Sequence, residues 1–145
     1  MTEIAFHFNV PDKLHYACRL LRKVYQSGNR ARVVGDADTL ATLDQALWTF
    51  AAQDFIPHCQ VNASAALLAH TPIVLATAAG DQDCGEALVN LGAAVPAGFE
   101  HYARLIELVS QSEADRADAR QRWRHYADGG YAITRYDWAA SPSNP

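Results

Sequence analysis

A run of consecutive apolar residues near the middle of the chain constrains the fold more than any other feature. Residues 73–76 read Ile-Val-Leu-Ala and lie between Pro72 and a turn at 79–81. A strand that is apolar at every position is typical of a parallel sheet with both faces covered, because a strand with one solvated face alternates apolar and polar residues. The run therefore predicts a sheet that lies between two layers of helices.

Further strand patterns precede and follow this run. Residues 3–10 alternate apolar and polar side chains, as a strand does, and short apolar strands are expected at 30–35 and 87–91. Residues 131–133 could add an edge strand, and the proline at position 57 predicts an extended link over 55–58.

Helical patterns separate these strands. Apolar residues recur at helical spacing after Asp12, and again after Asp36 or Asp38, either of which can cap the second helix. We also predict a helix over 99–109, and a last helix that begins at Ser112 and stops at the glycine pair 129–130. The alternation of strands and helices indicates an α/β sandwich around a mostly parallel sheet.

Length and composition fit a single domain. The chain has 145 residues, of which 50% are hydrophobic and 19% charged. We expect residues 1–140 to form this domain and 141–145 to be a flexible C-terminal tail. The start of the chain lacks a secretory pattern, and no run approaches the roughly 18 apolar residues of a membrane span, so we expect a cytoplasmic protein.

Charge is distributed unevenly along the chain. Residues 1–32 hold six bases and two acids (+4), residues 33–103 hold eight acids and no base (−8), and residues 104–145 hold six of each, which gives the net charge of −4. A net acidic chain argues against nucleic acid as the main ligand and makes a direct single-strand binder unfavourable, although a local patch could still touch phosphate.

The sequence lacks the motifs of common nucleotide-binding, metal-binding and catalytic sites. The turn after the first strand, residues 9–13, holds no glycine, whereas a dinucleotide fold needs Gly-x-Gly-x-x-Gly there, and the chain has no phosphate-binding Gly-Lys-Ser/Thr motif. The histidines lack the spacing of helical metal ligands. Cys84 follows Asp83, and an acidic neighbour makes a thiol a poorer nucleophile. Cys18, Cys59 and Cys84 form no Cys-x-x-Cys pair and are expected to stay reduced. We therefore expect no catalytic site, no cofactor and no metal.

An arginine row in the last predicted helix is one candidate binding site. Arg116, Arg120 and Arg124 recur every fourth residue, which places them on one side of a helix, and Trp123 lies next to them. Arg116 and Arg120 have no acid four residues away, so the row is expected to attract an external carboxylate. Trp123 or Tyr126 could floor an apolar pocket beside it. The alternative is an ordinary solvated face with weak pairs such as Asp118 with Arg122.

A second candidate site combines two large aromatic residues. Trp48 falls near the end of a predicted helix and Phe55 near Pro57, so both could be partly exposed anchors of a protein interface. The alternative is that both fill the core beneath the sheet, and the pattern alone favours that alternative slightly.

At these two candidate sites the chain resembles the chi subunit of bacterial DNA polymerase III, an accessory of the clamp loader. The resemblance extends over essentially the whole chain. It rests on three segments: Phe6-His7-Phe8; Leu43-Asp44-Gln45-Ala46-Leu47-Trp48 with Phe55-Ile56-Pro57-His58; and Ala119-Arg120-Gln121-Arg122-Trp123-Arg124-His125-Tyr126 with Gly130-Tyr131.

The resemblance implies a Rossmann-like three-layer fold without nucleotide binding, and a replisome adaptor without catalytic activity. It implies two partners: a psi subunit of the clamp loader (or a helicase using the same surface), and the acidic, Pro-Phe-ending C-terminal tail of single-stranded DNA-binding protein. DNA would be contacted only indirectly, and a membrane not at all. The tail-binding positions fall on Arg116, Arg120, Trp123 and Arg124, and the psi-facing positions on Trp48 and Phe55.

Two departures from the family pattern concern the tail site. Trp123 stands where a tyrosine is expected, and Ala127 stands where some members carry another base. The alternative function is a small α/β enzyme or nucleotide-binding protein whose motif has diverged. Thermal stabilisation by a nucleotide would favour that alternative, because a ligand of the native state raises the apparent stability.

Overall fold

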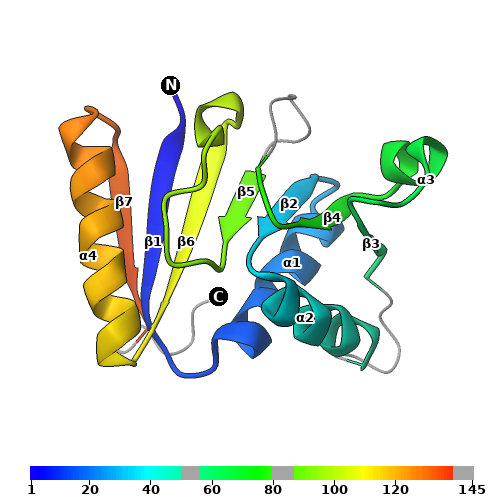
Figure 1. Ribbon diagram of the computed structural model, residues 1–145, viewed down its shortest axis with the longest axis horizontal. Helices are drawn as coiled ribbons and strands as arrows, with labels where there is room; N and C mark the ends of the chain where they lie inside the picture. The colour runs from blue at the N-terminus through cyan, green and yellow to red at the C-terminus, as the bar shows by residue number, and fades with distance from the viewer. Residues whose placement is uncertain (50–55, 80–86, 139–145) are drawn as a thin grey trace.

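The computed structural model describes residues 1–49, 56–79 and 87–138. Its centre is a seven-stranded sheet with the order β3-β4-β2-β5-β6-β1-β7, in which every neighbouring pair is parallel. Figure 1 shows β3 and β7 at opposite sides of the molecule. The strands are β1 (Glu3–Val10), β2 (Ala31–Val34), β3 (His58–Gln60), β4 (Ile73–Ala76), β5 (Ala87–Asn90), β6 (Arg104–Ser110) and β7 (Ile133–Asp137).

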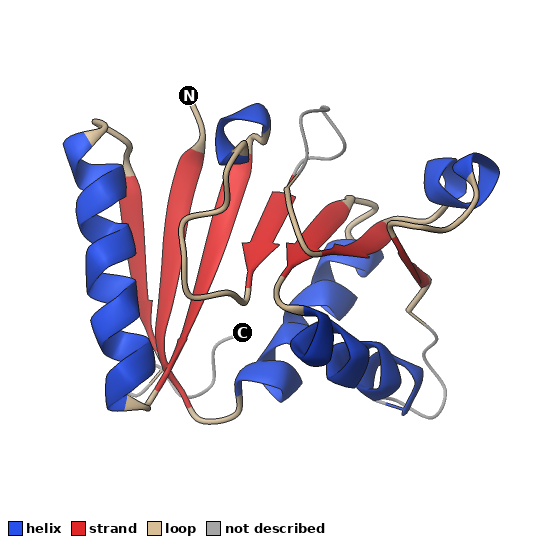
Figure 2. Ribbon diagram, viewed as in Figure 1, coloured by secondary structure: helices blue, strands red, loops and turns tan. Residues whose placement is uncertain are grey.

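Helices cover both faces of this sheet and make a three-layer structure (Figure 2). Helices α1 (Lys13–Gln26) and α2 (Ala37–Thr49) bury their apolar residues in one core cluster, against one face. Helix α4 (Glu113–Asp128) and the short 3₁₀ turn η1 (Phe99–His101) contribute to a second cluster on the other face. Helix α3 (Ala65–His70) lies near β3 and β4. None of the described helices is long and apolar enough to cross a membrane.

Three helices start at the side-chain N-caps that the sequence predicted. Asp12 accepts a hydrogen bond from the backbone amide of His15, Asp36 accepts one from Thr39, and the Ser112 hydroxyl accepts one from Asp115. Each cap satisfies a backbone amide that has no partner within its helix. Of the two acids proposed for the second helix, Asp36 is therefore the cap. Helix α4 ends as expected, with Gly130 in the left-handed region at φ +80°.

The predicted α/β fold with a mostly parallel sheet is confirmed, but the predicted helix over 99–109 is wrong. Most of this segment is β6, which lies between β5 and β1 in the sheet. Leu105, Ile106, Leu108 and Val109 are all buried, on both faces of the sheet. A short apolar run of this kind suits a helix and a buried strand equally well, and only its neighbours in the sheet decide between them.

The end of β1 is irregular, and this irregularity lies beside a surface pocket. The pairing of β1 with β6 shifts between His7 and Val10, and Asn9 adopts a left-handed backbone at φ +60°. The Asn9 side chain donates a hydrogen bond of 2.9 Å to Asp137 at the end of β7. Asparagine tolerates this conformation better than most residues, and such a bulge commonly redirects side chains near a site.

Candidate docking surfaces

The arginine row of α4 lines a surface pocket of about 370 Å³. The first turn of α4, capped by Ser112, starts the helix, and the four-residue spacing then exposes the three arginines on one side. The structure brings together all four residues that the sequence predicted for this site. The pocket is lined by Phe8, Asn9, Arg116, Ala119, Arg120, Trp123, Arg124 and Arg135.

Aromatic rings form the apolar part of this pocket. The Trp123 ring lies 6.1 Å from the Phe8 ring and 5.0 Å from the buried Phe6 ring, measured between centroids. Trp123 and Phe8 are partly exposed, so they present an apolar surface to the pocket. Tyr126 is fully buried and belongs to the core, so of the two candidate floors Trp123 is the one that the structure supports.

Arg135 of β7 also lines this pocket, and sequence reasoning missed it. Its guanidinium lies 4.9 Å from the centroid of the Phe8 ring, a cation–π distance. Residues 8 and 135 meet because β1 and β7 are neighbours in the sheet. The edge strand was predicted only over 131–133, whereas β7 spans Ile133–Asp137. Extending the predicted strand by two residues was the signal in the sequence that could have found Arg135.

Four arginines and no carboxylate line the pocket among the described residues. Arg116, Arg124 and Arg135 have no ion-pair partner in the described part of the chain, but Arg120 lies 3.2 Å from Glu113. The prediction considered only acids four residues away, and Glu113 lies seven residues before Arg120. This pair is weak because both side chains are more than half exposed, at 56% and 77%. Arg120 therefore remains available to an external carboxylate.

Arg122, on the same helix, does not belong to the solvated face. It is 2% exposed, and its Nε atom lies 3.0 Å from the carboxylate of Glu107 on β6. The possible surface pair of Asp118 with Arg122 is therefore wrong. Tyr126 donates a hydrogen bond of 2.5 Å to Glu107, and the Asn90 amide donates two of 3.1 Å.

The buried Glu107 cluster (Asn90, Glu107, Arg122 and Tyr126) is a polar network inside the second core. Burial raises the pKa of the Glu107 carboxyl, and Arg122, Tyr126 and Asn90 oppose this rise. Arg122 also donates a hydrogen bond of 2.8 Å to the carbonyl oxygen of Ala93, which ties the loop after β5 to α4. The cluster thus fixes the position of the helix that carries the arginine row.

The second candidate surface is built around Trp48, at the end of α2. Trp48 is 56% exposed, so the prediction that it fills the core is wrong. Its ring lies 5.0 Å from the ring of His58, the first residue of β3. His58 Nε2 lies 3.1 Å from the Asp44 carboxylate, and its Nδ1 lies 2.7 Å from the Ile56 carbonyl oxygen. Phe55 lies outside the described residues.

The Asp44–His58 contact joins the two halves of the sequence motif that suggested this surface. Asp44 and His58 were part of that motif, but only Trp48 and Phe55 were assigned a binding role. The His58 side chain is fully buried, its Nδ1 is hydrogen-bonded to the Ile56 carbonyl oxygen, and its Nε2 lies near the Asp44 carboxylate, so it gives Trp48 a well-placed neighbour. A large aromatic residue that is exposed and held in place is a typical anchor of a protein interface.

The cysteines of the described residues have the properties of core side chains. Cys18 and Cys59 are buried and free. Burial, with a smaller contribution from Asp12, raises the pKa of the Cys18 thiol to about 11, which disfavours the reactive thiolate. Within the described ranges, no three His, Cys, Asp or Glu side chains are grouped so that they could hold a metal ion. Cys84 lies outside these ranges.

These features define a parallel, three-layer α/β protein with a basic pocket at one side and an exposed tryptophan at the other. Residues 1–134 match the family described as "DNA polymerase III chi subunit, HolC", and the chain therefore belongs to that family. It is 30% identical over 139 residues to the DNA polymerase III subunit chi of Pseudomonas aeruginosa, a match that covers 92% of this chain and 94% of that protein. The chain is thus an accessory subunit of the machinery of DNA replication.

A solved structure with a similar fold comes from a different protein. The C-terminal domain of Dbp5 from S. cerevisiae, in a complex with Gle1, superposes with a TM-score of 0.62 and covers 94% of this chain and 90% of that one. The two sequences are 14% identical, so the likeness concerns the fold alone.

Proposed function

We propose that the chain is a non-catalytic adaptor that links a psi-type subunit of the clamp loader to the acidic C-terminal tail of single-stranded DNA-binding protein. The observation that carries this proposal is the pocket of α4, in which four arginines surround an aromatic floor. A peptide that is acidic and ends in Pro-Phe complements both properties.

The terminal carboxylate is expected at Arg120, the centre of the row. Arginine binds a carboxylate through two parallel hydrogen bonds, and Arg116 and Arg124, one turn away on either side, add to the positive field. The phenyl ring of the peptide packs against Trp123 and Phe8, whose rings lie 6.1 Å apart. The acidic residues before Pro-Phe then meet the outer arginines, including Arg135.

The Trp48 surface is assigned to the psi-type partner. The two surfaces lie at opposite sides of the molecule, because Trp48 lies next to β3 and the arginine pocket lies next to β7, and these are the two edge strands of the sheet (Figure 1). This separation supports an adaptor, since two partners on opposite edges do not compete for space.

A titration with a peptide of the acidic, Pro-Phe-ending tail tests this function. Arg120→Ala should weaken binding by about 2 kcal/mol or more, as loss of a desolvated charge contact does. Arg116→Ala and Arg124→Ala should mainly lower the association rate and the salt dependence. A peptide without its final phenylalanine should bind as poorly as the wild-type peptide binds to the Arg120→Ala variant.

Arg104→Ala is the matched control, because Arg104 is an exposed arginine that does not line this pocket. It should leave peptide binding unchanged. Equal losses for Arg104 and the three arginines of the row, with no effect of the phenylalanine deletion, would show diffuse attraction to an acidic chain and would refute the pocket.

A further inference from the structure

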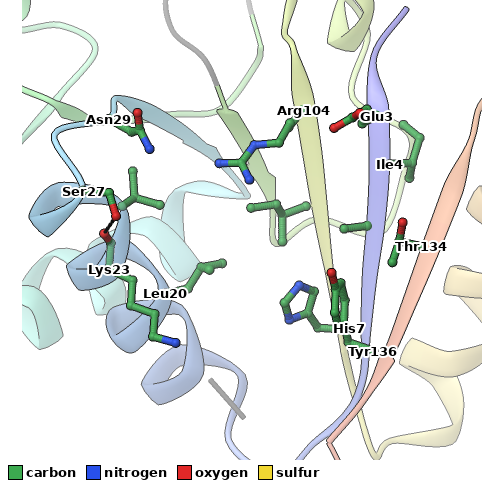
Figure 3. A pocket seen from close by; sticks show the side chains of 13 residues that line it. Glu3, Ile4, His7, Leu20, Lys23, Ser27, Asn29, Arg104, Thr134 and Tyr136 are labelled. Atoms are coloured by element: carbon green, nitrogen blue, oxygen red, sulfur yellow. Dashed lines mark hydrogen bonds between the residues drawn. The ribbon is translucent and has the colours of Figure 1, made fainter.

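A second pocket, of about 450 Å³, lies on the face of the sheet opposite α4. On this face α1 packs over β6, and the pocket lies between α1 and the neighbouring strands β1 and β7. Figure 3 shows it between the α1 ribbon and the sheet. Leu20, Val24, Ala5 and Ile106 give it an apolar floor, and polar and aromatic side chains surround that floor.

Two aromatic rings stand side by side in this pocket. His7 of β1 and Tyr136 of β7 are directly opposite one another in the parallel ladder, and their ring centroids lie 4.9 Å apart. Tyr136 is 43% exposed. The buried Tyr16 of α1 forms a hydrogen bond with the His7 ring through its hydroxyl and fixes the orientation of the ring. The pair therefore forms a fixed, accessible platform on the surface of a sheet.

Two cations line the pocket beside this platform. Lys23 reaches into the pocket from α1, and the Arg104 guanidinium extends from β6 toward α1 (Figure 3). In the described part of the chain, neither Lys23 nor Arg104 has an ion-pair partner. Among the described residues that line the pocket, Glu3 is the one carboxylate. It lies opposite Arg104 in the β1–β6 ladder, and Figure 3 places it away from the His7 and Tyr136 rings.

His7 contributes a neutral ring to this surface at neutral pH. Burial lowers the pKa of His7 to about 4, so that its ring offers a face and a hydrogen-bonding nitrogen without a charge. The positive charge of the pocket thus comes from Lys23 on α1 and Arg104 on β6.

We propose that this groove binds single-stranded DNA, with a base stacked on Tyr136 beside His7 and the backbone phosphates at Lys23 and Arg104. Exposed aromatic rings on adjacent strands of a sheet, flanked by cations, are a general means of holding single strands, because every base has a stacking face and every nucleotide has a charge. The duplex form does not suit this groove, since its bases are already stacked on one another.

The surface continues beyond this first pocket, as a bound strand requires. A neighbouring hollow shares Glu3, Asn29 and Arg104 with it, and another shares Asn29 and adds Arg30 and the 40% exposed Tyr25. The net acidic composition conceals this site because the eight acids of residues 33–103 dominate the net charge. Of the four of these acids that the structure describes, only Glu100 lines any of these three pockets. The proposal uses different residues from those of the tail pocket and does not depend on tail binding.

Fluorescence anisotropy of a labelled oligo-dT of about 12 nucleotides tests the proposal with the full chain. Wild-type protein should bind it saturably and more weakly at higher salt, between about 50 and 200 mM. The double variant Lys23→Ala/Arg104→Ala should weaken binding about tenfold or more, and Tyr136→Ala about fivefold or more, because each removes a phosphate or stacking contact. A duplex of the same length should bind less tightly.

The matched control is Arg116→Ala/Arg124→Ala, which removes the same charge from the other side of the protein. It should change oligo-dT binding less than twofold, about 0.4 kcal/mol. Tyr136→Leu, which keeps an apolar side chain on the edge strand, separates stacking from folding and should bind as weakly as Tyr136→Ala. Absence of saturable binding up to about 100 µM protein, or equal losses in the two double variants, would overturn the proposal.

Discussion

The Asp44 carboxylate lies 3.1 Å from the Nε2 atom of His58, and this contact links the middle of α2 to the start of β3. The His58 ring in turn lies 5.0 Å from the ring of Trp48. Asp44 and His58 therefore position the exposed tryptophan without forming much of the outer surface themselves.

Asp44→Ala should weaken the complex with a psi-type partner several-fold, because the His58 ring beside Trp48 loses its contact with the Asp44 carboxylate. Isothermal titration calorimetry with the partner measures this effect. Gln45→Ala, on the same helix and exposed, should have no effect. Unchanged partner binding by the Asp44→Ala protein would show that the contact serves stability alone.

Trp48→Ala and Phe55→Ala should each weaken the same complex by about 2 kcal/mol or more, as the loss of an aromatic anchor does. Trp48 is already 56% exposed, so its removal should leave the free energy of unfolding nearly unchanged. Binding of the acidic tail peptide should not change in either variant. If Phe55→Ala instead unfolds the protein or greatly destabilises it, Phe55 is a core residue and not an anchor.

Glu107→Ala should lower the free energy of unfolding by about 3–5 kcal/mol, because it leaves the guanidinium of Arg122 buried without its carboxylate partner. Urea denaturation measures the change. Glu113→Ala removes an acid of the exposed pair with Arg120, and should cost about 0–1 kcal/mol. Similar values for the two variants would contradict the role assigned to the buried cluster.

The stability of the protein should fall when the pH is lowered from 6.5 toward 4, in part because of His7. Burial lowers the pKa of His7 from 6.5 to about 4 in the folded state, so the unfolded state binds more protons in this window. The contribution of His7 is fully present above pH 6.5 and is lost as the pH falls through about 4. Urea midpoints across this range should decline less steeply in His7→Gln than in wild type. Parallel curves would show that His7 does not titrate with unfolding.

The parallel α/β fold and the grouping of the arginine row were predicted from local patterns, and the family was predicted from a resemblance over the whole chain. The spacing of Arg116, Arg120 and Arg124 is enough to place them on one side of a helix, because the helical period is a property of neighbouring residues. The same holds for the caps Asp12 and Ser112, whose side chains bond to amides three residues away.

The tertiary structure alone decided which distant residues complete each site. Phe8 and Arg135 join the arginine pocket, and His7 and Tyr136 form one platform, because β1 and β7 are neighbours in the sheet although they lie far apart in the sequence. No local period encodes that pairing; it depends on the order of the strands.

The same reason explains the segment that sequence reasoning misjudged. Residues 104–110 form a strand because β5 and β1 flank them on both sides, and Glu107 and Arg122 are tolerated inside the core because each meets the other there. From the sequence alone, Arg122 is one more base on a charged helix. Its burial follows from the packing of α4 on β6, which supplies the carboxylate that a buried guanidinium requires.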